Sequence, residues 1–77
     1  MIALGIDPGT ATCGFGVVAL DGGRLRLVDA GVVRTSADRT DADRLLDLRR
    51  ALTSLMAEHR PQRVAVERLF FQRNVQT

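Results

Sequence analysis

The change of hydrophobic period along the chain constrains its fold most. Apolar residues alternate with other residues over much of residues 1–33, which is the two-residue period of β-strands. Between residues 41 and 60 they return at the spacing of an α-helix, and a short apolar run follows at 63–67. A strand that follows such a helix is most simply reached by a right-handed crossover, which places it parallel to an earlier strand. The sequence therefore predicts an α/β fold with a mixed sheet.

Turn signals divide the β-rich region into three strands. The first ends at Asp7 before a proline and a glycine, and the second and third span residues 13–20 and 24–33. Asp21-Gly22-Gly23 between them is a hairpin signal, so we expect three consecutive antiparallel strands. The fourth strand, 63–67, should pair with the first, because the second and third already pair with each other. The predicted order across the sheet is third, second, first, fourth.

The helix has recognisable ends. It should begin near Thr40 or Asp41, where Asp41 and Asp43 suit the positive end of the helix dipole. Pro61 should stop it. One stripe of apolar residues should face the sheet: Leu45, Leu48, Leu52, Leu55 and Met56.

Two carboxylates close two of these strands. Asp7 lies at the last position of the first strand, on the face that otherwise carries only Ala3 and Gly5. Pro8 favours an extended Asp7, and Gly9 offers a position where positive φ is free. The second strand also carries glycines at alternate positions, which is typical of a close approach by backbone or ligand.

The fourth strand repeats this pattern with Ala65 and Glu67. Parallel neighbours about 4.8 Å apart would bring Asp7 and Glu67 side by side on the face opposite the helix. Adjacent carboxylates repel each other, which raises one pKa or recruits a cation, and hard oxygen ligands with room for water suit Mg²⁺ or Mn²⁺. The plainer alternative is that Asp7 begins a turn and Glu67 ends a strand in solvent.

The end of the chain differs in charge from its beginning. Residues 1–23 hold two acids and no arginine, whereas residues 60–77 hold four arginines and one acid. Aromatic rings beside arginines can stack on bases while the guanidinium groups bind phosphates. The alternative is that the phenylalanines cover the small core. The predicted nucleic-acid-binding residues are Arg68, Phe70, Phe71, Arg73 and Asn74.

Other residue types exclude several classes of site. The single cysteine, Cys13, is predicted to be a small buried residue, and the single histidine, His59, a surface residue that complements the helix dipole. One cysteine excludes an internal disulfide framework, which fits a cytoplasmic protein, and no zinc spacing is present. There is no P-loop pattern, and no apolar run reaches the length of a membrane span.

Three motifs taken together resemble the RuvC family of Holliday junction resolvases. They are Gly5-Ile6-Asp7-Pro8-Gly9, Gly14-x-Gly16 and Val66-Glu67-x-x-Phe70, and the resemblance covers the whole chain in order and spacing. It implies an RNase H-like fold and a homodimeric, metal-dependent endonuclease. Such an enzyme nicks two opposed strands of a four-way DNA junction symmetrically during homologous recombination and DNA repair, and a branch-migration helicase complex is its partner.

The resemblance also implies roles for single residues. Asp7 and Glu67 correspond to catalytic carboxylates that bind Mg²⁺ or Mn²⁺, two ions in a complete site, and Phe70 to an aromatic that stacks into the junction centre. The family's proteins are longer, and their remaining acidic ligands lie on a late helix that this sequence lacks. We therefore expect residues 1–77 to be the N-terminal half of a single RNase H-like nuclease domain, an incomplete fold that is inactive by itself.

Two other families share part of the pattern. A YqgF-type nuclease that acts on RNA has the same Gly-x-Asp-x-Gly opening. An actin-like or sugar-kinase-like domain would use the backbone of Gly9 and Thr10 to bind ATP phosphates. A plain interaction module would leave the two acid-ended strands unexplained.

Overall fold

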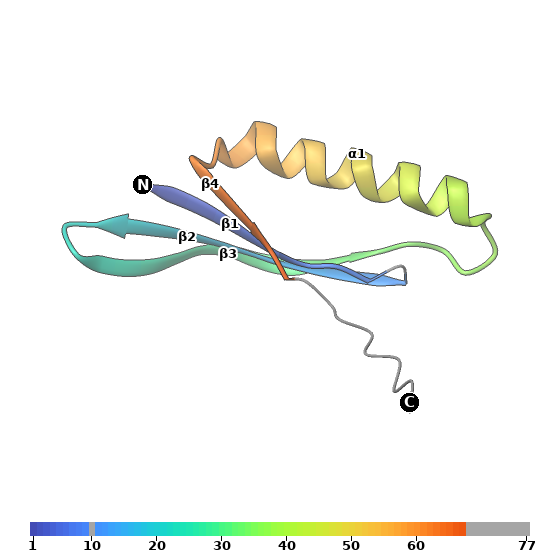
Figure 1. Cartoon of the computed structure of the whole chain (residues 1–77), viewed down its shortest axis with the longest axis horizontal. Coiled ribbons are helices and arrows are strands. Elements are labelled where there is room, and N and C mark those ends of the chain that lie inside the picture. The colour runs from blue at the N-terminus through green and yellow to red at the C-terminus, as the bar shows by residue number, and fades with distance from the viewer. Residues whose placement is uncertain (10, 68–77) are drawn as a thin grey trace, which may run out of the picture.

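Four strands and one helix make up the part of the chain that the computed structural model describes, residues 1–9 and 11–67. They are β1 (Ile2–Asp7), β2 (Thr12–Asp21), β3 (Arg24–Arg34), α1 (Asp41–His59) and β4 (Arg63–Val66). The sheet order is β3-β2-β1-β4, and β4 runs parallel to β1. The predicted strand order and the parallel pairing of β4 with β1 are confirmed. Figure 1 shows α1 lying along one face of the sheet; no other described element covers the opposite face.

The β2–β3 connection is a two-residue hairpin turn. Asp21 pairs with Arg24, and the turn residues Gly22 and Gly23 have φ values of 55° and 80°. Positive φ at both central positions is what a turn matching the twist of the strands requires, and glycine adopts it without steric cost. The predicted hairpin is confirmed.

A β-bulge interrupts the pairing of β2 with β3. Val17 lies opposite Asp29, whereas Val18 lies opposite Leu27, so Val28 is an extra residue on β3. A bulge of this kind changes which side chains of the strand face each side of the sheet. From Asp29 onwards, odd-numbered residues of β3 lie on the side of α1.

The core lies between α1 and the sheet. The buried residues are Leu4, Ile6, Cys13, Val17 and Ala19, and Ile2, Phe15, Val33, Leu48 and Leu52 pack around the central cluster. Cys13 is a small buried residue, as predicted. The predicted helix stripe is only partly confirmed: Leu48 and Leu52 pack on the core, whereas Leu45 and Met56 are 59% and 40% exposed. The stripe is wider than the contact that a single sheet layer makes with the helix.

Caps at both ends of α1 set the course of the chain into β4. The Thr40 hydroxyl accepts a hydrogen bond from the Asp43 amide at 3.1 Å. Arg60 adopts the left-handed conformation and donates its amide to the Met56 carbonyl, 2.9 Å away. Gln62 then makes two hydrogen bonds to Ile2. The backbone N–H of Gln62 donates to the Ile2 carbonyl (2.8 Å), and the side-chain Oε1 of Gln62 accepts from the backbone N–H of Ile2 (2.7 Å). These bonds hold the start of β4 beside β1. Within the described residues, no helix is both long and apolar enough to cross a membrane.

Candidate functional site

Asp7 and Glu67 lie next to each other on neighbouring parallel strands. Ile6 of β1 is opposite Val66 of β4, and the Glu67 amide donates a hydrogen bond to the Ile6 carbonyl at 3.0 Å. The two acids are the next pair in this register. Both are exposed. They lie on the sheet face away from α1, because Leu4 and Ile6 bury the opposite face of β1.

The two carboxyl groups interact electrostatically. The hydrogen bond with Asp7, and then the negative charge of Asp7, raise the pKa of Glu67 above its usual 4.5. Two like charges this close disfavour the doubly ionised state, and a cation between them would remove that penalty. The raised pKa of Glu67 therefore shows that the two carboxyl groups are close enough to share a proton and to repel each other.

A broad open groove of about 850 Å³ runs across the sheet beside the two acids. Its floor is built of residues with little or no side chain: Gly5, Gly14, Gly16, Ala30 and Ala65. A Cβ on Gly14 would make only ordinary contact with the Asp7 Cβ at 3.7 Å, and one on Gly16 would meet no heavy atom within 4 Å. Packing within the described residues therefore does not require glycine at either position. The small residues keep the space beside the acids open.

The turn after Asp7 is tight for a reason the sequence did not reveal. Among the glycines of the described residues, only Gly22 and Gly23 have positive φ, so Gly9 does not use the positive φ that glycine permits. A Cβ on Gly9 would instead collide with the carbonyl oxygen of Thr12. Glycine there lets the chain fold back closely from β1 into β2.

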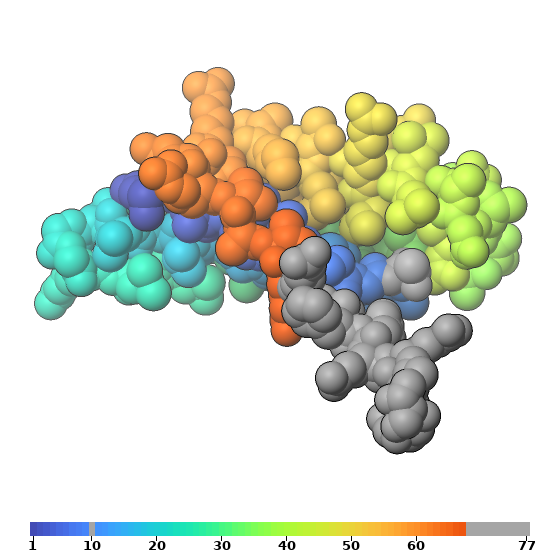
Figure 2. Space-filling view, viewed as in Figure 1, coloured from blue at the N-terminus to red at the C-terminus, as the bar shows by residue number. Residues whose placement is uncertain are grey.

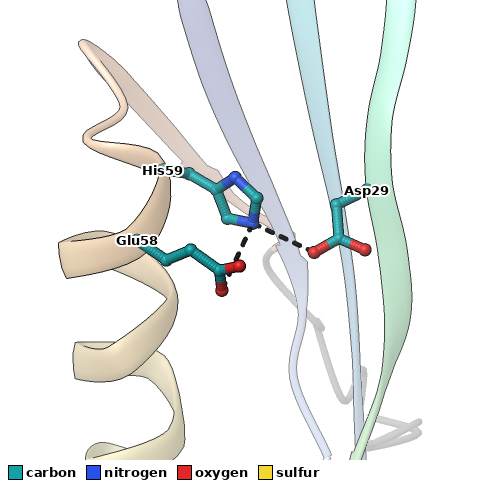
Figure 3. Close-up of side chains that lie close together, drawn as sticks. All are labelled: Asp29, Glu58 and His59. Carbon is teal, nitrogen blue, oxygen red and sulfur yellow. Dashed lines mark hydrogen bonds and ion pairs between the residues drawn. The ribbon is translucent and has the colours of Figure 1, made fainter.

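The expectation that His59 is a surface residue is wrong. Its side chain is only 13% exposed, and its Nε2 atom faces Asp29 Oδ2 at 3.0 Å and Glu58 Oε2 at 3.7 Å (Figure 3). The three side chains form a group that could hold a metal ion, on the α1 side of the sheet. Sequence reasoning missed it because Asp29 reaches this side only through the bulge. An acid in an otherwise apolar stretch of β3 was the one signal available.

The remaining predicted site residues lie outside the described part of the chain. They are the DNA-binding candidates Arg68, Phe70, Phe71, Arg73 and Asn74, together with Thr10 of the alternative ATP-binding interpretation.

Curated proteins with similar sequences carry the name of a crossover junction endodeoxyribonuclease. The family model described as "Crossover junction endodeoxyribonuclease RuvC" matches residues 3–77. A protein of that name from Chloroflexus aggregans is 53% identical over 77 residues, which cover 100% of this chain and 47% of the relative. The chain spans about half the length of the curated relatives it matches.

Solved structures agree with the sequence match. Thermus thermophilus RuvC superimposes with a TM-score of 0.85 at 35% identity, over 100% of this chain and 48% of that one. The T. thermophilus RuvC in complex with a Holliday junction substrate gives a TM-score of 0.82 at 36% identity, over 96% and 48% of the two chains. A mixed sheet of order 3-2-1-4 with one crossover helix is shared with these RNase H-like structures. The chain belongs to the RuvC family.

Proposed function

We propose that this chain is the N-terminal half of the nuclease domain of a crossover junction endodeoxyribonuclease, which resolves Holliday junctions in recombination and DNA repair. The observation that carries the proposal is the pair of carboxylates, Asp7 and Glu67, at the ends of the adjacent parallel strands β1 and β4. Membership of the RuvC family supports it. The complete enzyme would work in the cytoplasm.

The residues present suit a divalent metal centre. Asp7 and Glu67 offer anionic oxygen ligands, and the groove leaves space for water. The hydrogen bond with Asp7 and then its negative charge raise the pKa of Glu67, and a cation would relieve the charge repulsion. These features fit Mg²⁺ or Mn²⁺, with two ions in the complete site and the other ligands supplied from outside this chain. Such ions, when bound, activate water and stabilise the leaving oxygen of a phosphodiester. Asp7 would hold both ions and Glu67 one.

The surrounding residues would admit and position DNA. The floor of glycine and alanine would let a phosphodiester backbone approach the two acids closely. Arg68, Arg73 and Asn74 would contact phosphates, while Phe70, assisted by Phe71, would stack on unpaired bases at the junction centre. A homodimer would place two such sites on opposed strands, and a branch-migration helicase complex would present the junction. These partner roles rest on the family resemblance.

The test uses the full-length protein that carries this chain, with Mg²⁺, a labelled four-way junction and linear duplex of the same sequence. The expected result is paired symmetric nicks at the junction and none in the duplex. Asp7→Asn should abolish cleavage and retain junction binding. Asp21→Asn is the matched control, because Asp21 is an exposed acid of the β2–β3 hairpin outside the groove. Cleavage by Asp7→Asn at the wild-type rate would overturn the catalytic assignment, and equal cutting of duplex would overturn the junction substrate.

A further inference from the structure

A second set of metal-ligand side chains lies on the opposite side of the sheet from Asp7 and Glu67. We propose that Asp29, Glu58 and His59 bind a Zn²⁺ ion that ties the end of α1 to β3 (Figure 3). Asp29 comes from β3, and the other two residues are the last two of α1. An imidazole nitrogen with two carboxylate oxygens favours Zn²⁺ over Mg²⁺, which prefers oxygen ligands alone.

The spacing of the three ligand atoms fits this ion. His59 Nε2 lies 3.0 Å from Asp29 Oδ2 and 3.7 Å from Glu58 Oε2, and the three atoms are within 4.8 Å of one another. In a tetrahedral zinc site with bonds of about 2.0–2.1 Å, two ligand atoms are about 3.3 Å apart. The two distances from Nε2 lie on either side of that value. The three side chains would therefore supply three corners of a tetrahedron once Glu58 adjusts around the ion, with the fourth corner open to water.

Two of the ligands are held in place before any ion binds. The Ala30 amide donates a hydrogen bond to Asp29 Oδ1 at 2.9 Å, which leaves Oδ2 facing the histidine. The His59 side chain is 13% exposed and lies against the sheet. Glu58 is 67% exposed, so it is free to adjust around an ion. Outer hydrogen bonds that orient a ligand are a regular feature of metal sites.

The bulge in β3 is an independent observation that points to the same place. If the pairing of Val18 with Leu27 continued without a shift, Val28 would lie opposite Val17 and Asp29 would point to the open face. The bulge instead brings Asp29 beneath His59. Bulges are enriched next to functional sites, where they redirect a side chain.

The charges of the group also favour an ion over a simple ion pair. The Nε2 atom carries at most one proton, and in the tautomer that protonates this atom the proton is donated to Asp29 Oδ2, 3.0 Å away. Glu58 at 3.7 Å is beyond hydrogen-bond distance from the same atom, so two carboxylates surround one donor. A divalent cation would compensate both. It would also fix the end of α1 four residues before β4 begins at Arg63.

The experiment uses the full-length protein with Asp7→Asn and Glu67→Gln, so that the first acid pair does not bind the probe. Zn²⁺ is titrated by calorimetry, and Co²⁺ is followed by its visible absorption, which is strong only in tetrahedral sites. We expect one saturable site that requires these three residues. His59→Gln and Asp29→Asn should each weaken Zn²⁺ binding by about tenfold or more. Asp47→Asn is the matched control, because Asp47 is an acid of α1 whose carboxylate pairs with Arg39 instead.

His59→Gln or Asp29→Asn could fail to fold, and Glu58→Gln then tests the site instead. The Glu58 side chain is exposed, so its replacement should leave the fold intact. This variant should weaken Zn²⁺ binding and remove the zinc-dependent rise in melting temperature. Two results on Zn²⁺ affinity would overturn the proposal. One is the absence of a saturable Zn²⁺ site in the parent; the other is Zn²⁺ affinity in Glu58→Gln and His59→Gln equal to that of the parent. Asp29→Asn could also prove less stable than the parent in the presence of a chelator, while Zn²⁺ stabilises neither protein. That result would show that Asp29 and His59 form only an ion pair, and it would also reject the site.

Discussion

Replacing Gly31 by alanine tests the register that the bulge imposes on β3. Gly31 lies opposite Phe15 of β2, on the side of α1, and a Cβ built on it would lie 3.0 Å from both Cε1 and Cζ of the Phe15 ring. Phe15 packs against the buried cluster that contains Leu4 and Val17. The ring therefore has to move away from the new methyl group and disturb the core.

The size of the effect follows from these distances. Carbon atoms in favourable contact are about 3.5–4.0 Å apart, so the ring has to give way by a few tenths of an ångström. Overpacking of this kind costs about 1–3 kcal/mol of unfolding free energy. In a complete domain about twice as long as this chain, each kcal/mol lowers the melting temperature by about 2–4 °C. We expect Gly31→Ala to be destabilised by an amount in this range.

Thermal and urea unfolding followed by circular dichroism measure the change, with Gly16→Ala as the matched control. A Cβ on Gly16 enters the open groove and meets no heavy atom within 4 Å, so this variant should be neutral or about 0.4–1 kcal/mol more stable. Phe15→Leu combined with Gly31→Ala should recover part of the loss. Equal stability of Gly31→Ala and Gly16→Ala would refute the reasoning. Without the bulge Gly31 would lie opposite Gly14 on the open face, where a methyl group meets no ring.

Two further perturbations test the core and the acid pair. Leu4→Ala should lower the free energy of unfolding by about 2–5 kcal/mol because Leu4 is 1% exposed. Leu25→Ala is the control: this residue is 72% exposed, so the change should be less than about 0.5 kcal/mol. Similar losses for the two variants in denaturant titrations would contradict the assigned core. Asp7→Asn should return the pKa of Glu67 toward 4.5, measured by NMR titration of its carboxyl carbon, with Asp21→Asn as control. Because the folded-state pKa of Glu67 is raised, its contribution to stability is present below pH 4.5 and is lost as the pH rises through that raised value. Asp7→Asn should abolish this loss. Identical curves of stability against pH for the wild-type protein and Asp7→Asn would count against the coupling of the two acids.

The strands, the helix, their order and the adjacency of Asp7 and Glu67 could be predicted from local sequence patterns. Turn residues such as Gly22-Gly23 and the cap at Thr40 mark where elements begin and end, and they act over only a few residues. The crossover through α1 then makes β4 parallel to its neighbour, and β1 is that neighbour because β2 and β3 already pair with each other. Since Asp7 and Glu67 stand at the ends of strands so paired, their adjacency follows from the same rules.

Only the tertiary structure decided which face several side chains occupy. The bulge at Val28 depends on how β3 pairs with β2 over many residues, and a one-residue shift moves Asp29 and Gly31 to the other side of the sheet. Whether Leu45 and Met56 are covered depends on how much of α1 the sheet reaches, which helical spacing does not show. The sequence by itself thus determined the elements, their order and the acid pair, because these depend on short-range chemistry and chain handedness. The structure decided strand register and helix contact, and with them the Asp29–Glu58–His59 group, because those arise from packing between segments distant in the chain.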